Sequence, residues 1–322
     1  MRPELSVVIP VLDEAPNIEA LFRELVEVLS SWGRNFEAIV IDDGSTDDTF
    51  EILSRLQAND PRLRVIRFRR NFGQTAAFSA GFAHARGRLI VTADGDLQND
   101  FRDIPRMVEK LTEGFDIVCG WRKARQDPWL SRVLVSNLAN LLISRVTGVR
   151  LQDYGCSLKV FRSEVVKSLR LYGEMHRFIP AIASEQGVRI AEVVVNHRPR
   201  RHGRSKYGIS RTVPVLLDLA TVKFLLSYST RPLQIFGLVG LIMGGAGTTI
   251  IGWLAWIRLF GGQAIGGRPL LLFGILLLFT GLQLVTLGLL AELQARTYHE
   301  SQGKPTYHIR EVLEAQAEES MS

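Results

Sequence analysis

The chain of 322 residues has few cysteines and lacks the common phosphate-binding signatures. Its two cysteines, Cys119 and Cys156, have no metal-ligand spacing, so we expect reduced thiols rather than a disulfide framework. No G-x-G-x-x-G follows the first apolar stretch and no Gly-Lys-Ser/Thr loop occurs, which argues against a dinucleotide-binding unit and a P-loop. The composition does not fit disorder, and no internal repeat is visible. The length allows one large domain or two smaller ones.

Ionisable residues are absent from two long apolar runs, residues 233–257 and 270–291. Each run exceeds the roughly 20 residues that a helix needs to cross a bilayer. We therefore predict two transmembrane helices. Gly240 and Gly244 form a small-residue pair that favours close packing of these helices, with an oligomer interface as the alternative.

The membrane topology is predicted from the charges around these runs. No basic-then-apolar signal precedes the first apolar stretch, so we expect the first domain to stay in the cytoplasm. The connection between the runs carries only Arg258 and Arg268, whereas the side before the first run is rich in Arg and Lys. The positive-inside rule then places both termini on the cytoplasmic side of the cell (inner) membrane.

The net charge of +6 indicates an anionic partner. The position of the basic residues in the sequence indicates which kind of anion this is. The densest basic group lies shortly before the first apolar run and comprises Arg198, Arg200, Arg201, Arg204, Lys206 and Arg211. This position favours anionic lipid or a lipid phosphate over nucleic acid.

Strand and helix patterns alternate over the first hundred or so residues, which indicates a mostly parallel sheet covered by helices. We expect strands at 6–10, 36–41, 63–68, 88–91, 116–120 and 191–195, and helices at 15–29, 46–57, 75–85 and 129–146. Residues 177–180 begin or interrupt another helix. We also expect an amphipathic helix at the membrane interface over 210–227 and a weakly ordered polar tail after Glu292.

Asp94, Asp96 and Gln98 follow the fourth expected strand at a spacing of two residues. Alternate residues of an extended segment point the same way, so these side chains could present oxygens to Mg²⁺ or Mn²⁺. The alternative is an ordinary acidic turn, because Asp-Gly is a common turn dipeptide.

Acids also follow the first and second strands, as Asp13 with Glu14 and as Asp42 with Asp43. The carboxyl ends of parallel strands face one crevice, where these side chains should converge with those of the fourth strand. Since acids repel phosphates, a nucleotide diphosphate would reach them through a divalent cation.

These motifs resemble the membrane-bound family 2 (GT-A) glycosyltransferases that act on polyprenyl phosphates, such as dolichol-phosphate mannose synthase and the GtrB-type and ArnC-type enzymes. The resemblance covers residues 8–14, 42–47, 94–98 and 153–162, the pattern Arg200-x-x-Gly203-x-Ser205-Lys206-Tyr207, and the two apolar runs. The form Asp153-Tyr154-Gly155-Cys156 is most similar to the ArnC branch. Relatives often have Tyr where this chain has Leu12, and Arg where it has Lys159. These differences leave open which nucleobase and which sugar the donor carries.

The resemblance implies roles for individual residues. Nucleotide-sugar binding falls to Pro10, Glu14, Asp42, Asp43, Asp94, Arg177, Arg200 and Lys206, metal binding to Asp94, Asp96 and Gln98, and lipid-phosphate binding to Arg122, Arg132 and Ser136. The reaction would invert the sugar carbon. The resemblance also makes Asp96 and Asp153 the catalytic residues. Because an ionised lipid phosphate hardly needs a base, Asp153 could be an orienting group as well as a base.

Structural alternatives remain at several of these positions. Asp42 and Asp43 could cap the helix expected at 46–57. Asp153 could be a buried acid paired with Arg or Lys, and Arg132 could extend toward lipid headgroups. Arg200, Arg201 and Arg204 could form a nonspecific lipid-binding surface.

At the level of the whole chain, we expect a catalytic domain over 1–209, an interface helix over 210–230, a two-helix anchor over 231–292 and a tail over 293–322. The expected partners are a UDP- or GDP-linked sugar, a polyprenyl phosphate and the bilayer, with homo-oligomerisation possible and no nucleic acid. A processive polysaccharide synthase and a non-catalytic scaffold are the alternatives. The first normally needs more spans and a Gln-x-x-Arg-Trp motif, which the sequence lacks.

Overall fold

The computed structural model describes residues 2–123, 144, 148–169, 171, 175–184, 186–199, 232–262, 264, 266–301 and 307–314. The chain consists of two compact units. The first contains Met1–Val222 and Pro305–Ser322, and the second contains Lys223–Lys304.

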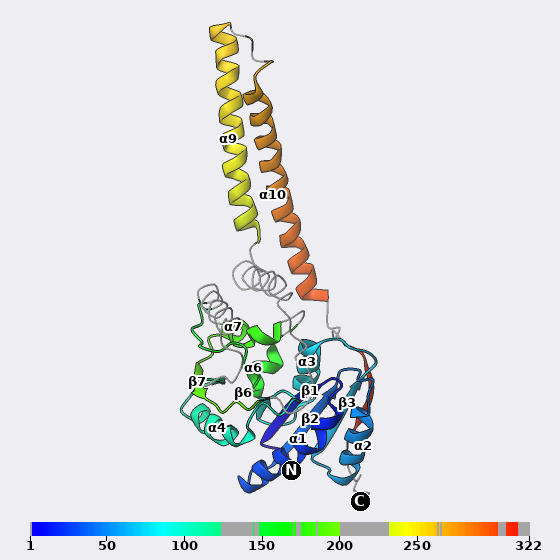
Figure 1. Ribbon diagram of the computed structural model, residues 1–322. Helices are drawn as coiled ribbons and strands as arrows, with labels where there is room; N and C mark the ends of the chain where they lie inside the picture. Colours follow the sequence, from blue (N-terminus) through cyan, green and yellow to red (C-terminus); the bar gives the residue numbers. More distant parts are fainter. Residues whose placement is uncertain are drawn as a thin grey trace, which may run out of the picture. The chain divides into compact units, whose positions relative to one another are not determined.

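A mixed sheet forms the centre of the first unit, and its described strands follow the order β7-β5-β6-β4-β1-β2-β3-β8 (Figure 1). Strands β1 to β4 run parallel, whereas β6 is antiparallel to both of its neighbours and β8 is antiparallel to β3. The expectation of a mostly parallel sheet is confirmed. The bounds are β1 (Leu5–Val11), β2 (Phe36–Asp42), β3 (Leu63–Phe68), β4 (Leu89–Thr92), β5 (Ile117–Trp121), β6 (Lys159–Arg162), β7 (Ile190–Val194) and β8 (Ile309–Leu313).

The helices of this unit are α1 (Ala15–Ser31), α2 (Thr49–Asn59), α3 (Gln74–His84), α4 (Ile104–Thr112), α6 (Ser163–Ser168) and α7 (Ile179–Ser184), with 3₁₀ turns η1 (Phe101–Asp103) and η2 (Met175–Phe178). Helices α1, α2 and α3 agree with the predicted ones, and α7 begins within 177–180, whereas α4 and α6 were not predicted. Helix α2 begins at Thr49 rather than at Thr46, and the backbone N–H of Thr46 donates instead to Asp13 Oδ1 at 2.8 Å in the preceding turn. The helices expected at 129–146, apart from Ser144, and at 210–227 lie outside the described residues.

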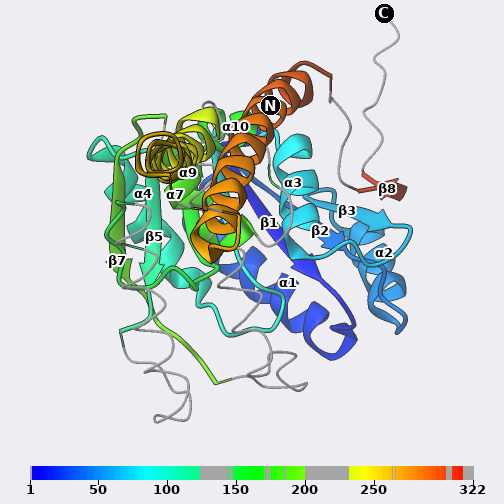
Figure 2. The ribbon, with the colours of Figure 1, turned by 90° about the horizontal axis from the view of Figure 1, so that it is seen from above.

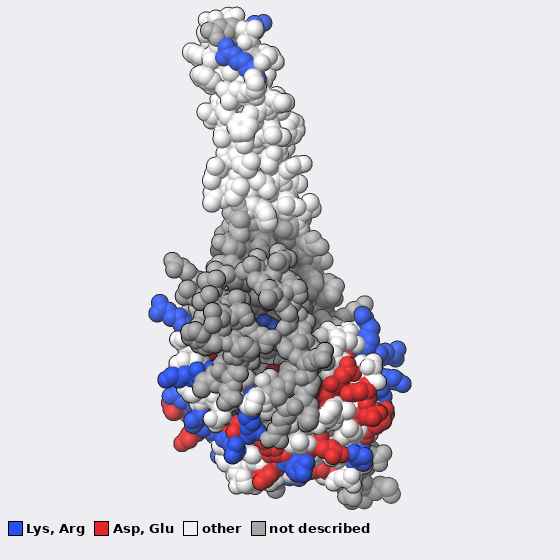
Figure 3. Space-filling model, viewed as in Figure 1, with Lys and Arg blue, Asp and Glu red and all other residues white. Residues whose placement is uncertain are grey.

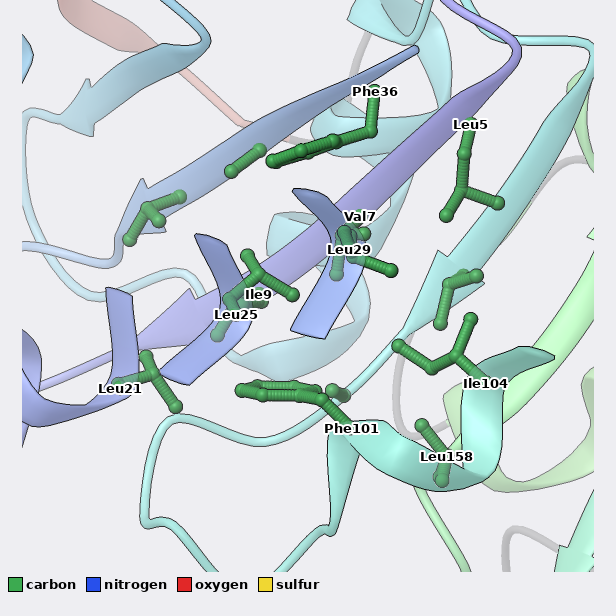
Figure 4. Close-up of a cluster of buried hydrophobic side chains, with 14 of the residues drawn as sticks. Leu5, Val7, Ile9, Leu21, Leu25, Leu29, Phe36, Phe101, Ile104 and Leu158 are labelled. Carbon is green, nitrogen blue, oxygen red and sulfur yellow. The ribbon is translucent and has the colours of Figure 1, made fainter. Parts of the chain in front are cut away.

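Helices cover both faces of the sheet because alternate residues of β1 point to opposite sides. Leu5, Val7 and Ile9 pack with α1 and α4 in one core (Figure 4). Val8 points to the other face, where α3 approaches so closely that a Cβ on Gly81 would collide with it. The cysteines belong to the buried part of this unit, and both are free thiols, as expected.

A buried polar network joins the amino ends of β1, β2 and β3. Glu37 Oε1 accepts hydrogen bonds from Ser6 Oγ at 2.6 Å and from the backbone N–H of Arg86 at 2.7 Å. Glu37 Oε2 accepts from Arg64 at 3.0 Å, and both side chains of this ion pair are 7 % exposed. The charges are thus paired and hydrogen-bonded, the condition under which an interior tolerates them.

The C-terminal tail contradicts one expectation. Residues Ile309–Leu313 form β8 along the outer side of β3 (Figures 1 and 2). Glu314 continues this edge and pairs with Arg64 at 2.9 Å and with Arg86 at 2.8 Å. A weakly ordered tail was therefore the wrong prediction for 307–314, because pairing with β3 supplies the order that the polar composition does not suggest.

The second unit is a pair of long helices, α9 (Pro232–Gly261) and α10 (Pro269–Ser301). Segments of both are long and apolar enough to cross a membrane, and their surface carries large exposed apolar side chains such as Leu241 and Leu272. Where its residues are described, the face seen in Figure 3 is almost free of charge except near the connection between the helices. A Cβ on Gly281 would lie 2.5 Å from the backbone of both Gly240 and Gly244, so the expected close packing is confirmed.

Replacement of Glu37 by Ala tests the buried network. Because Ser6 and Arg64 would each lose a partner in a dry site, although Arg64 keeps Glu314, we expect the first unit to lose about 3 kcal/mol of stability. The measurement is thermal unfolding of the full chain, compared with Glu19→Gln, which removes an exposed ion pair with Arg55. Equal, small shifts for both variants would contradict the assigned role of Glu37.

Candidate active site

Four loops meet at the carboxyl ends of the parallel strands. They follow β1, β2, β3 and β4 and comprise residues 12–14, 43–48, 69–73 and 93–100. Backbone hydrogen bonds fix their start, from Asp43 N to the carbonyl of Val11 at 2.9 Å and from Ala93 N to that of Val8 at 3.2 Å. The register of the sheet thus brings together the acids that the sequence places after β1, β2 and β4.

The turn after β4 holds Asp94, Asp96 and Gln98 in a fixed backbone conformation. Asp96 Oδ1 accepts from the backbone N–H of Gln98 at 3.1 Å, and Asn99 Oδ1 accepts from that of Asp94 at 2.9 Å. Leu97 adopts a left-handed conformation with φ of 62° and is buried in the core. Such strain in a non-glycine residue persists only where surrounding contacts impose it, and it is commonly found at functional sites.

Gly95 lets this turn lie directly on β1. A Cβ at this position would approach Val11 Cγ1 to 2.6 Å and the carbonyl oxygen of Pro10 to 3.4 Å. Pro10 is half-buried and pairs with Ile41 of β2, beyond the last residue of β1 that pairs with β4. The predicted nucleotide residue Pro10 and the predicted metal motif are therefore neighbours.

Asp43 is bound by the loop that follows β3. Its two carboxylate oxygens accept from the backbone N–H groups of Phe72 at 2.7 Å and Gly73 at 2.9 Å. Burial raises the pKa of Asp43, although these two donors oppose the shift. One residue further on, Gln74 donates from Nε2 to Asp94 Oδ1 at 2.8 Å. Residues 72–74 thus link the loop after β2 with the loop after β4.

Asp42 and Glu14, which were also predicted to bind the nucleotide sugar, have separate hydrogen-bond partners. Asp42 is fully buried, accepts from Ser45 N at 2.8 Å, and lies 3.5 Å from Arg67 Nε. Glu14 accepts from Asn17 Nδ2 at 2.6 Å. Neither Asp42 nor Asp43 caps α2, whose N-cap is Asp48.

Arg122 and Asp153 form a bidentate ion pair. Arg122 Nε lies 2.7 Å from Asp153 Oδ2, and its Nη2 lies 3.0 Å from Oδ1. Burial opposes the charge of Arg122, but its hydrogen bonds to Asp153 raise its pKa above the ordinary value, as does the nearby charge of Asp94. The structure therefore unites a predicted lipid-phosphate ligand with the predicted base or orienting group.

Arg198, the first residue of the basic group, lies beside the Asp94–Gln98 turn. Arg198 N donates to the carbonyl of Gln98 at 3.0 Å, and Gln98 Nε2 donates to that of Arg198 at 3.3 Å. The Arg198 side chain pairs with Glu24 at 2.8 Å and with Asp100 at 2.7 Å. Burial opposes ionisation of Asp100, but hydrogen bonds from Arg102 and Arg198 lower its pKa to about 2. Arg198 is thus an anchor within the protein.

Other predicted residues are less well defined. Arg177 is half-buried in η2, next to His176, which is hydrogen-bonded through Nδ1 to Thr75 Oγ1 of α3 at 2.8 Å. Arg132, Ser136, Arg200 and Lys206 lie outside the described residues.

The donor set at the turn suits a hard cation. Among the described residues, no group of three or more His, Cys, Asp or Glu side chains could hold a metal ion. Mg²⁺, however, is commonly bound by one or two carboxylates together with substrate phosphates, rather than in a cage of protein ligands. Asp94 and Asp96, with the amide of Gln98, fit that arrangement.

Sequence reasoning missed two supporting residues, Gln74 and Asn99, because it considered acids and basic clusters and both of these side chains are neutral. Arg198 was assigned to the basic group expected to face anionic lipid, whereas its side chain is paired within the protein with Glu24 and Asp100. The signal for Gln74 was present, because the polar run 69–74 follows the carboxyl end of β3.

Comparisons with known proteins agree with this geometry. Residues 6–170 match the family described as glycosyl transferase family 2. The dodecaprenyl-phosphate galacturonate synthase of Rhizobium johnstonii is 44% identical over 98% of this chain and 94% of its own length. The undecaprenyl-phosphate 4-deoxy-4-formamido-L-arabinose transferase of Edwardsiella ictaluri is 39% identical over 97% of this chain and 94% of its own.

A similar fold occurs in the glucosyl-3-phosphoglycerate synthase of Mycobacterium tuberculosis, crystallised with Mn²⁺ and UDP-glucose. The two chains superpose with a TM-score of 0.51 over 68% of this chain and 79% of that one, at 23% sequence identity. The sequence match and the acidic loops at the carboxyl ends of the strands lead to one conclusion: this chain belongs to glycosyl transferase family 2.

Proposed function

We propose that this glycosyltransferase moves one sugar from a nucleotide sugar to the phosphate of a polyprenyl phosphate at the cytoplasmic face of the membrane, with inversion at the sugar carbon. The observation that carries the proposal is the convergence of the Asp43 and Asp94–Gln98 loops at one sheet edge. The names of the two relatives, which both specify a polyprenyl phosphate, supply the acceptor.

The donor would lie across the loops at the carboxyl ends of β1, β2 and β4. Pro10, Glu14 and Asp43 would form the nucleoside end, and Asp42, which is fully buried, would act by holding the turn at Ser45 rather than by contact with the donor. A carboxylate has about four acceptor positions, so Asp43 can bind a nucleoside while it accepts from Phe72 and Gly73.

Asp94, Asp96 and Gln98 would hold Mg²⁺ or Mn²⁺ at the diphosphate. Such a cation would neutralise the charge of the departing nucleoside diphosphate. We further propose that Arg177, Arg200 and Lys206 contribute positive charge around the phosphates.

Arg122 and Asp153 would orient the acceptor rather than remove a proton. The carboxylate of Asp153 accepts two hydrogen bonds from the guanidinium of Arg122. A phosphate monoester is already largely dianionic at neutral pH, with a second pKa of about 6. Arg122, with Arg132 and Ser136, would therefore aim this anion at the sugar carbon.

The fold supports the proposed membrane topology. Strand β8 follows α10 in the chain and pairs with β3, which precedes α9. The segments before α9 and after α10 must therefore lie on the same side of a membrane that both helices cross. The positive-inside rule makes that side the cytoplasm.

The decisive test of function uses the purified full chain with undecaprenyl or dodecaprenyl phosphate and a panel of nucleotide sugars. The panel carries nucleotide-linked galacturonate, 4-deoxy-4-formamido-L-arabinose, glucose and mannose, as UDP or GDP derivatives, with Mn²⁺ or Mg²⁺. We expect a lipid product heavier by one sugar residue with one of these donors, measured by mass spectrometry. The absence of a lipid product with every donor would contradict the proposal.

Asp96→Ala tests the proposed metal site. The loss of one ligand should lower transfer by at least about 100-fold, since electrostatic stabilisation of the departing charge is worth several kcal/mol. Chelation of divalent cations should have the same effect on the unaltered chain. Asp48→Ala removes an exposed acid at the start of α2 and serves as the control. Full transfer by Asp96→Ala in Mn²⁺ buffer, with unfolding temperature unchanged, would refute the assignment.

The contact between Gly95 and Val11 provides a test by compensation. Gly95→Ala should displace the turn and lower transfer by about 10- to 100-fold, because small misplacements of catalytic groups are costly. Adding Val11→Ala removes the atom that lies 2.6 Å from the new Cβ and should restore part of the rate. Val11→Ala alone is the control. If the double variant is no faster than Gly95→Ala, close approach is not the reason for glycine.

A further inference from the structure

The loop after β3 lies between the acidic loops and the C-terminal segment. On one side, Phe72 and Gly73 donate to Asp43 and Gln74 donates to Asp94. The backbone of the same loop also lies against Gly44, where an added Cβ would come within 2.5 Å of the carbonyl carbon of Arg70. This side of the loop therefore determines where two predicted ligand residues lie.

The other side of the loop contacts the residues that precede β8. The ring of Tyr307 stacks on Phe68, with centroids 5.1 Å apart and planes inclined by 14°. His308 meets the edge of Phe72 at 5.9 Å, and its carbonyl accepts from the backbone N–H of Arg69 at 3.1 Å. Phe68 and Phe72 also contact each other edge-to-face at 5.7 Å. Tyr307 and Phe68 are both buried, so the stack of these two rings is shielded from water.

On the side of the loop away from Asp43, the contacts seen among the described residues are these and a local contact of Arg70 with the ring of Phe72. Arg69, Arg70 and Asn71 are exposed, and Gly73 has a φ of 92°, which favours glycine and leaves the backbone permissive. Its aromatic anchor, Phe72, is only half-buried. The stacked rings of Phe68 and Tyr307, with His308, are the contacts that fix the loop from the side opposite Asp43.

We propose that Tyr307 and His308 are positioning residues of the donor site: they hold residues 69–74 against Asp43 and Asp94. The inference rests on the proposed function for its enzymatic consequence. It gives the C-terminal segment a role in substrate binding, although this segment follows the second membrane helix and lies more than two hundred residues from the loop in sequence.

The antiparallel pairing of β8 and β3 supplies a matched control. Ile309 pairs with Phe68 near the site, whereas Leu313 pairs with Val65 toward the other end of β3. At about 3.3 Å per residue, Glu314 lies roughly 20 Å along the strand from Tyr307. Glu314→Gln weakens the ion pairs with Arg64 and Arg86 without touching the loop.

Transfer kinetics of the full chain test the proposal, with the donor that the panel identifies. Tyr307→Ala should raise the KM for the nucleotide sugar about tenfold, with the KM for the polyprenyl phosphate within twofold. Tyr307→Phe, which keeps the stacked ring, should restore the donor KM, and Glu314→Gln should leave it within twofold. An unchanged donor KM in Tyr307→Ala, or an equal rise in Glu314→Gln, would overturn the proposal.

Hydrogen exchange keeps the test independent of the proposed function. The amides of Phe72 and Gly73 should exchange at least about tenfold faster in Tyr307→Ala than in the unaltered chain or in Tyr307→Phe. If the unaltered chain transfers no sugar, the proposed function fails while this measurement still decides whether Tyr307 holds the loop. Unchanged exchange at Phe72 and Gly73 in a folded Tyr307→Ala chain would overturn the proposal.

Discussion

The site depends on holding several carboxylates close together at one edge of a sheet. Asp43 and Asp94 belong to different loops, yet residues 72–74 bind both. The donors are two backbone N–H groups and one side-chain amide, and none carries a charge. Neutral donors stabilise carboxylates without cancelling the negative field that a divalent cation requires. A lysine or arginine in their place would compete with the cation for the same oxygens.

A different solution is used at Asp153. There the carboxylate is neutralised by the bidentate guanidinium of Arg122, and the backbone N–H of Asp153 is held by Glu192 at 3.2 Å. Lys159 also stabilises this loop, because its ammonium donates to the backbone carbonyls of Tyr154 and Cys156. The structure thus separates acids that accept hydrogen bonds from neutral donors, at Asp43 and Asp94, from an acid that is part of an ion pair, at Asp153.

Much of the fold could be predicted from the sequence, because apolar periodicity and the alternation of strand and helix determine β1 to β5 and α1 to α3. The convergence of Asp43 and Asp94 follows from the rule for parallel strands. The hydrogen bonds from Thr46 to Asp13 in the turn before α2 could not be predicted, since they join residues more than thirty positions apart. The pairing of Arg122 with Asp153 was likewise one alternative among several, because it requires β5 and the 153–158 loop to be neighbours. Strand β8 escaped prediction because it is a short strand within a polar tail and its order comes from pairing with the edge of β3.

The place of β8 in the chain has a consequence for biosynthesis. Strand β3 is made early, but its edge partner is translated only after both apolar helices. During synthesis, the outer edge of β3 therefore stays unpaired while α9 and α10 emerge from the ribosome. An open strand edge invites pairing with other chains, so this enzyme is most exposed to aggregation in that interval, and the arrival of β8 ends it.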